Sequence, residues 1–195
     1  RINSQLELMT DDALRVLACA EKPIAGPQVS ESALEQGLTF LGLVGLIDPP
    51  RPEVKAAIKQ ARQAGIRTIM VTGDHKKTAA AISTQLGLIT PESPDILTGT
   101  EWEALSTEEQ REQVRRTAVF ARVTPSHKLS IVQALRANGE IVAMTGDGVN
   151  DAPAVREADI GISMGVQGTD VTREASAMVL TDDNYSTIVN AVKEG

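Results

Sequence analysis

Residues 143–153 read AMTGDGVNDAP, and this stretch decides how the rest of the sequence is interpreted. It begins at the end of the apolar run IVA at 141–143 and packs two aspartates, an asparagine and two glycines into six residues. An earlier segment, IRTIMVTGD at 66–74, also ends an apolar run with Thr-Gly-Asp. The sequence therefore predicts two buried strands that each end in a Thr-Gly-Asp turn.

Strands and helices alternate in the sequence around these two turns. The apolar runs predict strands at 38–47, 66–72, 118–123, 140–145, 158–164 and 176–181. Helical patterns occur at 52–64, 76–87, 106–116, 125–139, 151–158 and 186–195. This alternation predicts an α/β fold, a doubly wound parallel sheet with helices on both faces. In such sheets the ligand site lies at the carboxyl ends of the strands, so both turns are expected to meet at one crevice.

Prolines and glycines give the expected ends of several elements. The segment Asp48-Pro-Pro-Arg-Pro52 ends one strand abruptly, and Pro52 is well suited to the first position of the following helix. Thr124 is the expected N-cap of the helix at 125–139. Residues 12–20 fit either a helix or a strand, and 22–37 read as a loop with a short helical piece.

The dense polar turn at 144–154 has the composition of a magnesium and phosphate site. Glycines beside aspartates let backbone N–H groups approach an anion, and the following helix directs its positive end to the same place. Carboxylates would repel a phosphate unless a hard cation lies between them, and Mg²⁺ binds carboxylate and phosphate oxygens together. Asp147 and Asp151 are therefore candidate Mg²⁺ ligands, and Asn150 can donate to a phosphoryl oxygen.

Lys128 is a further candidate, because it lies near the start of a helix, where the helix dipole favours a cation least. An anion in the same site would explain its position, and the lysine would then neutralise phosphate charge. The alternatives are simpler: a single Thr-Gly-Asp can be only a turn with an N-cap aspartate, and Lys128 can be a solvated surface lysine. His75 and His127 are expected to make polar contacts with their neighbours rather than to act in catalysis.

Composition limits the classes of function. The net charge of −7 disfavours a broad nucleic-acid surface, so no nucleic-acid partner is expected. Cys19 is the single cysteine, which excludes an internal disulfide and a cysteine metal site. No apolar run approaches 18 residues, so a membrane span is not expected and the segment should be soluble. The sequence starts with arginine, which fits a piece of a longer polypeptide.

Several motifs together resemble the P-type cation-transporting ATPases, most closely the calcium-pump-like group. The matching segments cover almost all of 38–195 and are DPPRPEV (48–54), MVTGD (70–74), FARVTPSHK (120–128), MTGDGVNDAPA (144–154), ADIGISMG (158–165) and MVLTDDNYSTIV (178–189). The resemblance implies a haloacid-dehalogenase-like Rossmannoid fold for residues 48–195, the phosphorylation domain. It also implies that residues 1–47 are the C-terminal remnant of the nucleotide-binding domain.

The resemblance further implies roles for individual residues. The residues matched to ATP or phosphate contacts are Arg15, Thr72, Gly73, Asp74, Arg122, Lys128 and Asn150. Asp147 matches the Mg²⁺ ligand, and Asp151 matches a second acidic group at the metal site. Lys128, Asp147, Asp151 and Thr72 form the expected catalytic set. The implied substrate is ATP with Mg²⁺, and the implied partners are the other domains of the pump and a cation held by membrane helices.

The sequence departs from the family pattern in one respect: it has no Asp-Lys-Thr-Gly-Thr segment. That segment carries the aspartate that becomes phosphorylated. We therefore expect a cytosolic fragment that lacks the first strand of the sheet, has an unpaired edge or gap, and is inactive alone. Its expected place is the cytoplasmic face of a pump in a bacterial plasma membrane. Two alternatives stay open at this point: a soluble phosphatase of the haloacid dehalogenase type, and a non-catalytic module that binds nucleotide or Mg²⁺.

Overall fold

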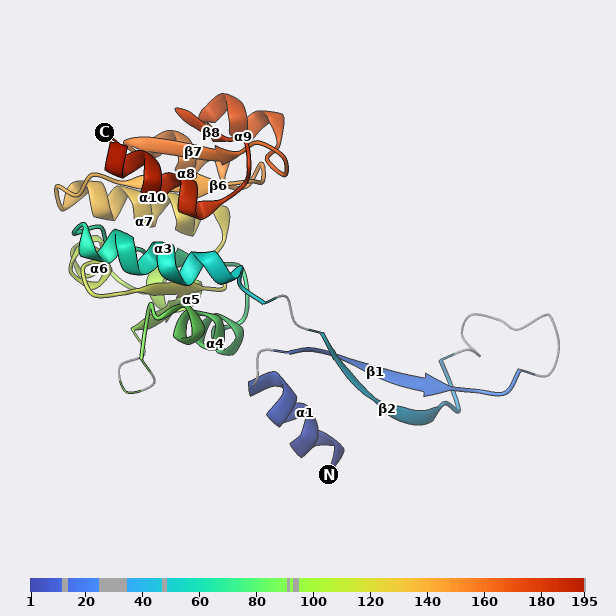
Figure 1. Cartoon of the computed structure of the whole chain (residues 1–195). Helices are drawn as coiled ribbons and strands as arrows, with labels where there is room; N and C mark the ends of the chain where they lie inside the picture. The colour runs from blue at the N-terminus through green and yellow to red at the C-terminus, as the bar shows by residue number, and fades with distance from the viewer. Residues whose placement is uncertain (12–13, 25–34, 47–48, 91, 93–94, 195) are drawn as a thin grey trace. The chain divides into compact units, whose positions relative to one another are not determined.

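The structure is a computed structural model, and it describes the chain except for residues 12–13, 25–34, 47–48, 91, 93–94 and 195 (Figure 1). The chain divides into two compact units, Arg1–Pro49 and Pro50–Gly195. Among the described helices, none combines the length and the apolar character needed to cross a bilayer. In the proline-rich segment predicted to end a strand, Asp48 lies outside the described residues, whereas 49–52 are described.

The first unit is a helix followed by a β-hairpin. Helix α1 (Ile2–Asp11) precedes strand β1 (Arg15–Glu21), which pairs with strand β2 (Thr39–Leu46) in antiparallel fashion. The stretch at 12–20 that fits either a helix or a strand is therefore mainly strand. The predicted loop and helical piece at 22–37 lies largely outside the described residues.

The second unit contains two three-stranded parallel sheets. In the first, β3 (Met70–Val71), β5 (Val119–Ala121) and β4 (Ile96–Thr98) lie in the order β3-β5-β4. In the second, β6 (Ala143–Gly146), β7 (Ile160–Met164) and β8 (Met178–Leu180) lie in the order β6-β7-β8. Parallel strands linked by helices confirm the predicted α/β fold class.

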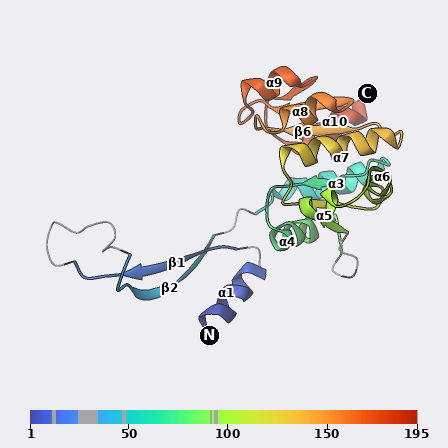
Figure 2. The ribbon, with the colours of Figure 1, turned by 180° about the vertical axis from the view of Figure 1, so that it is seen from behind.

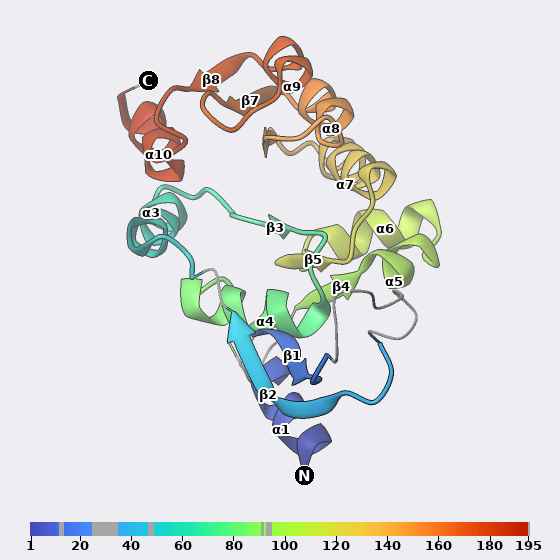
Figure 3. The ribbon, with the colours of Figure 1, turned by 90° about the vertical axis from the view of Figure 1, so that its right-hand side faces the viewer.

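Helices cover both faces of these sheets (Figure 3). Their bounds are α3 Pro52–Gln63, α4 Lys76–Leu86, α5 Gly99–Glu103, α6 Thr107–Val114, α7 Pro125–Ala137, α8 Ala152–Glu157, α9 Asp170–Ala175 and α10 Tyr185–Glu194. Thr124 caps α7 as predicted, because its hydroxyl accepts from the His127 N–H while the His127 ring accepts from the Thr124 N–H. Figure 2 shows α7 next to α8, and the two helices pack together.

Two apolar clusters lie on opposite faces of the first sheet. On one face Trp102 packs edge-on against Phe120, with ring centroids 5.2 Å apart, and the Trp102 indole N–H donates to Ser130 Oγ of α7 at 2.8 Å. On the other face Val119 and Ala121 pack with Ala79 of α4. Alternate residues of β5 thus point to opposite helical layers. This packing fixes the position of α7 and of the loop that precedes it.

Helices α3 and α10 pack side by side through Ala57, Ala61 and Val189. At the start of α3, Arg51 donates to the Asp183 carbonyl, just before α10, at 2.8 Å. Near the other end, Lys193 donates to Gln60 Oε1 at 3.3 Å. Because the start of α3 lies beside the start of α10, and the two far ends also lie together, the helices run in the same direction.

The structure also differs from the sequence-based expectations in four places. Strand β4 and helix α5 occupy part of 88–117, where only a later helix was predicted, and α9 was not predicted. The strand predicted at 66–72 is limited to Met70–Val71, because it pairs only with β5. The strand predicted at 140–145 begins at Ala143 and reaches Gly146.

Candidate functional site

The second Thr-Gly-Asp turn folds back tightly onto helix α8. Strand β6 ends at Gly146, where an added Cβ would lie 2.5 Å from Asp151 Cβ and 2.9 Å from Val155 Cγ2. The Asp151 N–H donates to the Gly148 carbonyl at 2.9 Å, which closes the turn. Glycine at position 146 is therefore required by the close approach of the turn to the start of α8.

Asp151 and Lys128 form an ion pair at the carboxyl ends of two strands. Lys128 lies in the first turn of α7, after β5, and Asp151 immediately precedes α8, after β6. The Lys128 Nζ to Asp151 Oδ1 distance is 2.5 Å, and the side chains are 19% and 9% exposed. The same carboxylate accepts from the backbone N–H groups of Asp147 and Gly148, both at 3.3 Å. Asp151 therefore does not cap α8 with its side chain but joins the turn to Lys128.

These contacts set the ionisation of Asp151. Burial raises the pKa of this carboxyl, but the Lys128 ammonium and the two backbone N–H groups favour the charged form more strongly. The net effect holds the pKa of Asp151 below its ordinary value. Asp151 is thus a carboxylate at neutral pH, and its charge is matched locally by Lys128.

The start of helix α9 also holds the second turn through hydrogen bonds. The Thr172 hydroxyl, which is fully buried, donates to the Gly148 carbonyl at 2.8 Å. The Thr169 N–H donates to the Asp147 carbonyl at 2.9 Å. Sequence reasoning did not identify these two threonines. The only local signal was the Gly-Thr-Asp at 168–170, which resembles a helix N-cap, and Thr169 does cap α9.

The first Thr-Gly-Asp turn is held by the main chain of the residues that follow β5. Thr72 Oγ1 accepts from the Asp74 N–H at 3.1 Å. The Arg122 N–H donates to the Asp74 carbonyl at 2.9 Å, and the Val123 N–H donates to the Thr72 carbonyl at 3.2 Å. Arg122 adopts a left-handed backbone conformation with φ of 51°. The predicted residues Thr72, Gly73, Asp74 and Arg122 are thus brought together by backbone contacts.

The other predicted site residues are exposed or make contacts only with their neighbours. Asp147 and Asn150 are exposed, and the structure gives the Asp147 carboxylate no hydrogen bond or ion pair to any described residue. Arg15 belongs to the first unit and is exposed on β1. His75 caps α4, and His127 caps α7 and lies 3.5 Å from Glu103, so both make the neighbour contacts expected of them.

Metal ligation at this turn would rest on two carboxylates. Within the described part of the chain, no group of three or more His, Cys, Asp or Glu side chains is arranged to hold a metal ion. Asp147 is free to bind a cation, whereas Asp151 is already engaged by Lys128. Such a set suits Mg²⁺, which commonly keeps several waters and uses one or two carboxylates together with phosphate oxygens.

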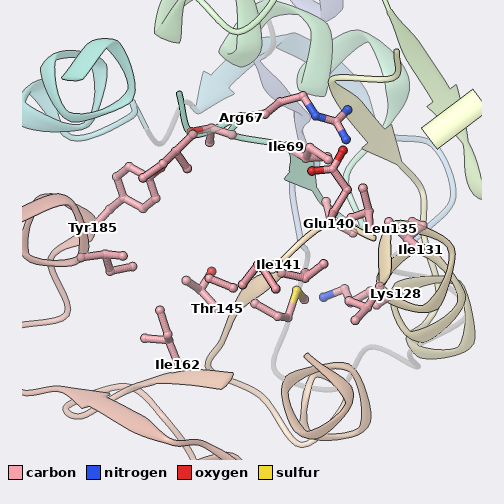
Figure 4. Close-up of a pocket in the computed structure, with 18 of the residues that line it drawn as sticks. Arg67, Ile69, Lys128, Ile131, Leu135, Glu140, Ile141, Thr145, Ile162 and Tyr185 are labelled. Atoms are coloured by element: carbon pink, nitrogen blue, oxygen red, sulfur yellow. The ribbon is translucent and has the colours of Figure 1, made fainter. Parts of the chain in front are cut away.

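A cavity of about 450 Å³ is lined in part by Lys128 (Figure 4). Its lining includes Ile69 and Val71 from the first sheet and Ala143 and Thr145 from the second. Sequence reasoning expected an unpaired edge or gap in the sheet, and this cavity lies where the edges of the two sheets face each other.

Comparisons with known proteins agree with the fold. The Calcium-transporting ATPase of Bacillus subtilis (strain 168) is 56% identical over 191 residues, which are 97% of this chain and 21% of that protein. The Calcium-transporting ATPase 1 proteins of Lactococcus lactis subsp. lactis (strain IL1403) and Saccharomyces cerevisiae (strain ATCC 204508 / S288c) are 47% and 46% identical over the whole chain. The chain spans about a fifth of the length of these relatives. The family model of the haloacid dehalogenase-like hydrolases matches residues 13–159, and the chain belongs to that family.

Proposed function

We propose that this chain is part of an ATP-driven calcium pump and provides its Mg²⁺ and phosphate site. The observation that carries the proposal is the Lys128–Asp151 ion pair, set beside an aspartate that is free to bind a cation. Support also comes from the relatives, which are named as calcium-transporting ATPases and match 97% and 100% of the chain. In this proposal the first unit, with Arg15, belongs to a nucleotide-binding domain that delivers ATP.

The residues around the turns have separate tasks in this proposal. Asp147 holds Mg²⁺, and Asp151 keeps Lys128 in place while adding negative charge near the metal. Bound Mg²⁺ would supply a positive charge that draws phosphate oxygens to the carboxylates. Lys128 stabilises the negative charge of the phosphoryl group as it transfers, and Asn150 donates to one of its oxygens. Thr72, Gly73, Asp74 and Arg122 orient the nucleotide phosphates from the opposite turn.

The phosphorylated aspartate must come from outside these 195 residues, because they contain no Asp-Lys-Thr-Gly-Thr segment. The chain alone is therefore proposed to bind Mg²⁺ and phosphate without turning over ATP. The cation would bind between membrane helices of the complete polypeptide, with the present chain on the cytoplasmic side.

Removing the free carboxylate is expected to weaken Mg²⁺ binding. D147N should lower the apparent Mg²⁺ affinity of the chain about tenfold, because one of two carboxylates is lost. The measurement is the Mg²⁺-dependent rise in melting temperature in the presence of inorganic phosphate. D95N is the matched control, since Asp95 is exposed and precedes β4 at the amino edge of the sheet. Equal Mg²⁺ affinity in D147N and wild type would remove Asp147 from the proposed site.

The transport function is tested in membrane vesicles that carry the complete polypeptide. We expect them to accumulate labelled calcium when ATP and Mg²⁺ are added, and to lose this uptake when the complete polypeptide carries D147N. D95N in the same polypeptide should leave uptake intact. If ATP drives no calcium uptake in wild-type vesicles, the calcium assignment is wrong even where Mg²⁺ binding is confirmed.

A further inference from the structure

Helix α9 packs against α8 and β7, and its first residues are hydrogen-bonded to the second Thr-Gly-Asp turn. The carbonyl of Asp147 accepts from the Thr169 N–H at 2.9 Å, and the carbonyl of Gly148 accepts from the Thr172 hydroxyl at 2.8 Å. These two contacts hold two successive peptide units. Helix α9 therefore fixes the main chain immediately after Asp147.

The peptide unit between Asp147 and Gly148 is held from both sides. None of the described peptide bonds is cis, so the carbonyl and the N–H of this unit point in opposite directions. Its carbonyl contacts Thr169, and its N–H donates to Asp151 Oδ2 at 3.3 Å. A shift of α9 would therefore turn this N–H away from the carboxylate that also binds Lys128.

The hydroxyl protons around Thr172 have one arrangement. The Thr172 hydroxyl has a single proton, which goes to the Gly148 carbonyl because that carbonyl can only accept. The Thr169 hydroxyl, 2.8 Å from that of Thr172, is then the donor in the contact between them. It also accepts from the Thr172 N–H at 3.4 Å. The fully buried Thr172 hydroxyl thus both donates and accepts.

Helix formation alone does not explain a hydroxyl at this buried position. Threonine is a weaker helix former than alanine, and a buried hydroxyl is costly unless it is hydrogen-bonded. The side chain that caps α9 is Thr169, whereas the Thr172 hydroxyl donates across 24 positions to the turn. The Gly148 carbonyl already accepts from the Asp151 N–H at 2.9 Å. The Thr172 contact is therefore not needed to satisfy this carbonyl, but it does orient it.

The direction of the Asp147 side chain depends on this main-chain geometry. The Asp147 carboxylate is exposed, and it makes no hydrogen bond or ion pair to any described residue. Asp151, in contrast, is held by Lys128 and by two backbone N–H groups. A ligand that no neighbouring side chain holds can be preorganised only through its backbone.

We propose that Thr172 is a positioning residue for the Mg²⁺ site. Its hydroxyl fixes the peptide units that follow Asp147 and so presets the direction of the Asp147 carboxylate. The proposal rests on the proposed function, because it requires that Asp147 binds Mg²⁺. It adds a residue that lies outside the turn and touches neither the metal nor the phosphate.

The test variant is T172V, because valine has nearly the same shape as threonine but no hydroxyl. We expect its Mg²⁺ affinity to fall about threefold, less than in D147N, since the ligand itself is still present. T172S restores the hydroxyl and should restore the affinity. The measurement is isothermal titration calorimetry of the whole chain with Mg²⁺ and inorganic phosphate, well below the melting temperature of every variant. T172A replaces T172V if valine prevents folding.

The matched control is T117V, which removes another buried hydroxyl. Thr117 is 1% exposed, and its hydroxyl donates to the Gln113 carbonyl at 3.0 Å, before the start of β5. T117V should lose stability, because a buried hydrogen bond is removed. It should bind Mg²⁺ as the wild type does, since Thr117 does not contact the turn.

A second measurement needs no Mg²⁺. Amide hydrogen exchange at Asp147 and Gly148 reports how firmly their N–H groups are held against the Asp151 carboxylate. In the metal-free chain, exchange at these two amides should be faster in T172V than in the wild type. T172S and T117V should exchange there at the wild-type rate.

Three results would overturn the proposal. They are wild-type Mg²⁺ affinity in T172V when D147N binds more weakly, an equal loss in T172S and T172V, and an equal loss in T117V. The second would assign the effect to packing of the methyl group, and the third to general destabilisation. If D147N itself binds Mg²⁺ as the wild type does, the Mg²⁺ site under Asp147 is wrong and the role of Thr172 falls with it.

Discussion

Replacing Lys128 by methionine is expected to lower the free energy of unfolding by about 3 kcal/mol at neutral pH. Methionine keeps most of the apolar stem of the side chain but removes its charge. The Asp151 carboxylate, which is 9% exposed, then stays buried with only the backbone N–H groups of Asp147 and Gly148 as partners. Removal of one partner from a buried pair is costly because the remaining charge is not compensated.

The loss in K128M should depend on pH in a defined direction. In the wild type the pKa of Asp151 is lowered below its ordinary value of 3.8, so its contribution is present above that value and is lost as the pH falls through the lower folded-state pKa. In K128M the ion pair is absent, and burial then acts to raise the pKa of Asp151. The stability difference between the two proteins should therefore shrink as acid protonates Asp151 in both.

Urea unfolding of K128M at a series of pH values measures this effect. The matched control is K76M, which breaks the surface ion pair of Lys76 with Glu101, whose side chains are 43% and 48% exposed. Exposed pairs contribute less than about 1 kcal/mol, so K76M should change stability little. If both variants lose the same amount, or the K128M loss does not change with pH, the Lys128–Asp151 pair is not the cause.

The two Thr-Gly-Asp turns should respond very differently to alanine at their glycines. G146A is expected to lower the free energy of unfolding by about 2 to 3 kcal/mol, because the new methyl group overlaps Asp151 Cβ and Val155 Cγ2. The start of α8 must move to admit it, which also displaces Asp151 from Lys128. G73A should be close to neutral, since a Cβ at Gly73 meets no atom within 4 Å.

Thermal unfolding of the two alanine variants provides the comparison, and hydrogen exchange at the start of α8 provides a local readout. A loss in G146A that is no larger than in G73A would contradict the packing shown at the second turn. The same result would show that the resemblance between the two turns extends to their three-dimensional surroundings.

The strand–helix alternation could be predicted from the sequence because it depends on local pattern. The Thr124 cap and the strand before Gly146 are examples, since each is encoded by residues within a few positions. Strand β4 and helix α5 were missed because three-residue strands carry too few side chains to show a period. Trp102, fully buried in α5, marks this region as part of the core only once Phe120 and Ser130 are placed beside it.

The candidate site was predicted in outline, but its internal contacts were not. The dense run of aspartates identified Asp147 and Asp151 as candidates. That Asp151 is paired while Asp147 is left exposed depends on Lys128, which lies 23 positions before Asp151. Thr172 donates to the Gly148 carbonyl from helix α9, and the sequence gives no sign of that contact. Asp183 was also missed: its buried carboxylate accepts from the N–H groups of Val166 and Gln167, and the first of these contacts contributes most to lowering its pKa.

The parallel packing of α3 and α10 has a mechanical consequence. The chain enters the second unit at the start of α3 and reaches its last described residue at the far end of α10. A tension applied between these two points would pull the helices along their common axis, so that they slide past each other. Sliding loads the Ala57, Ala61 and Val189 contacts and the Arg51 hydrogen bond together, whereas peeling would break them one at a time. Contacts that must break together raise the barrier to unfolding, and forced unfolding is governed by the unfolding rate. We therefore expect this unit to resist stretching more than its modest apolar core suggests.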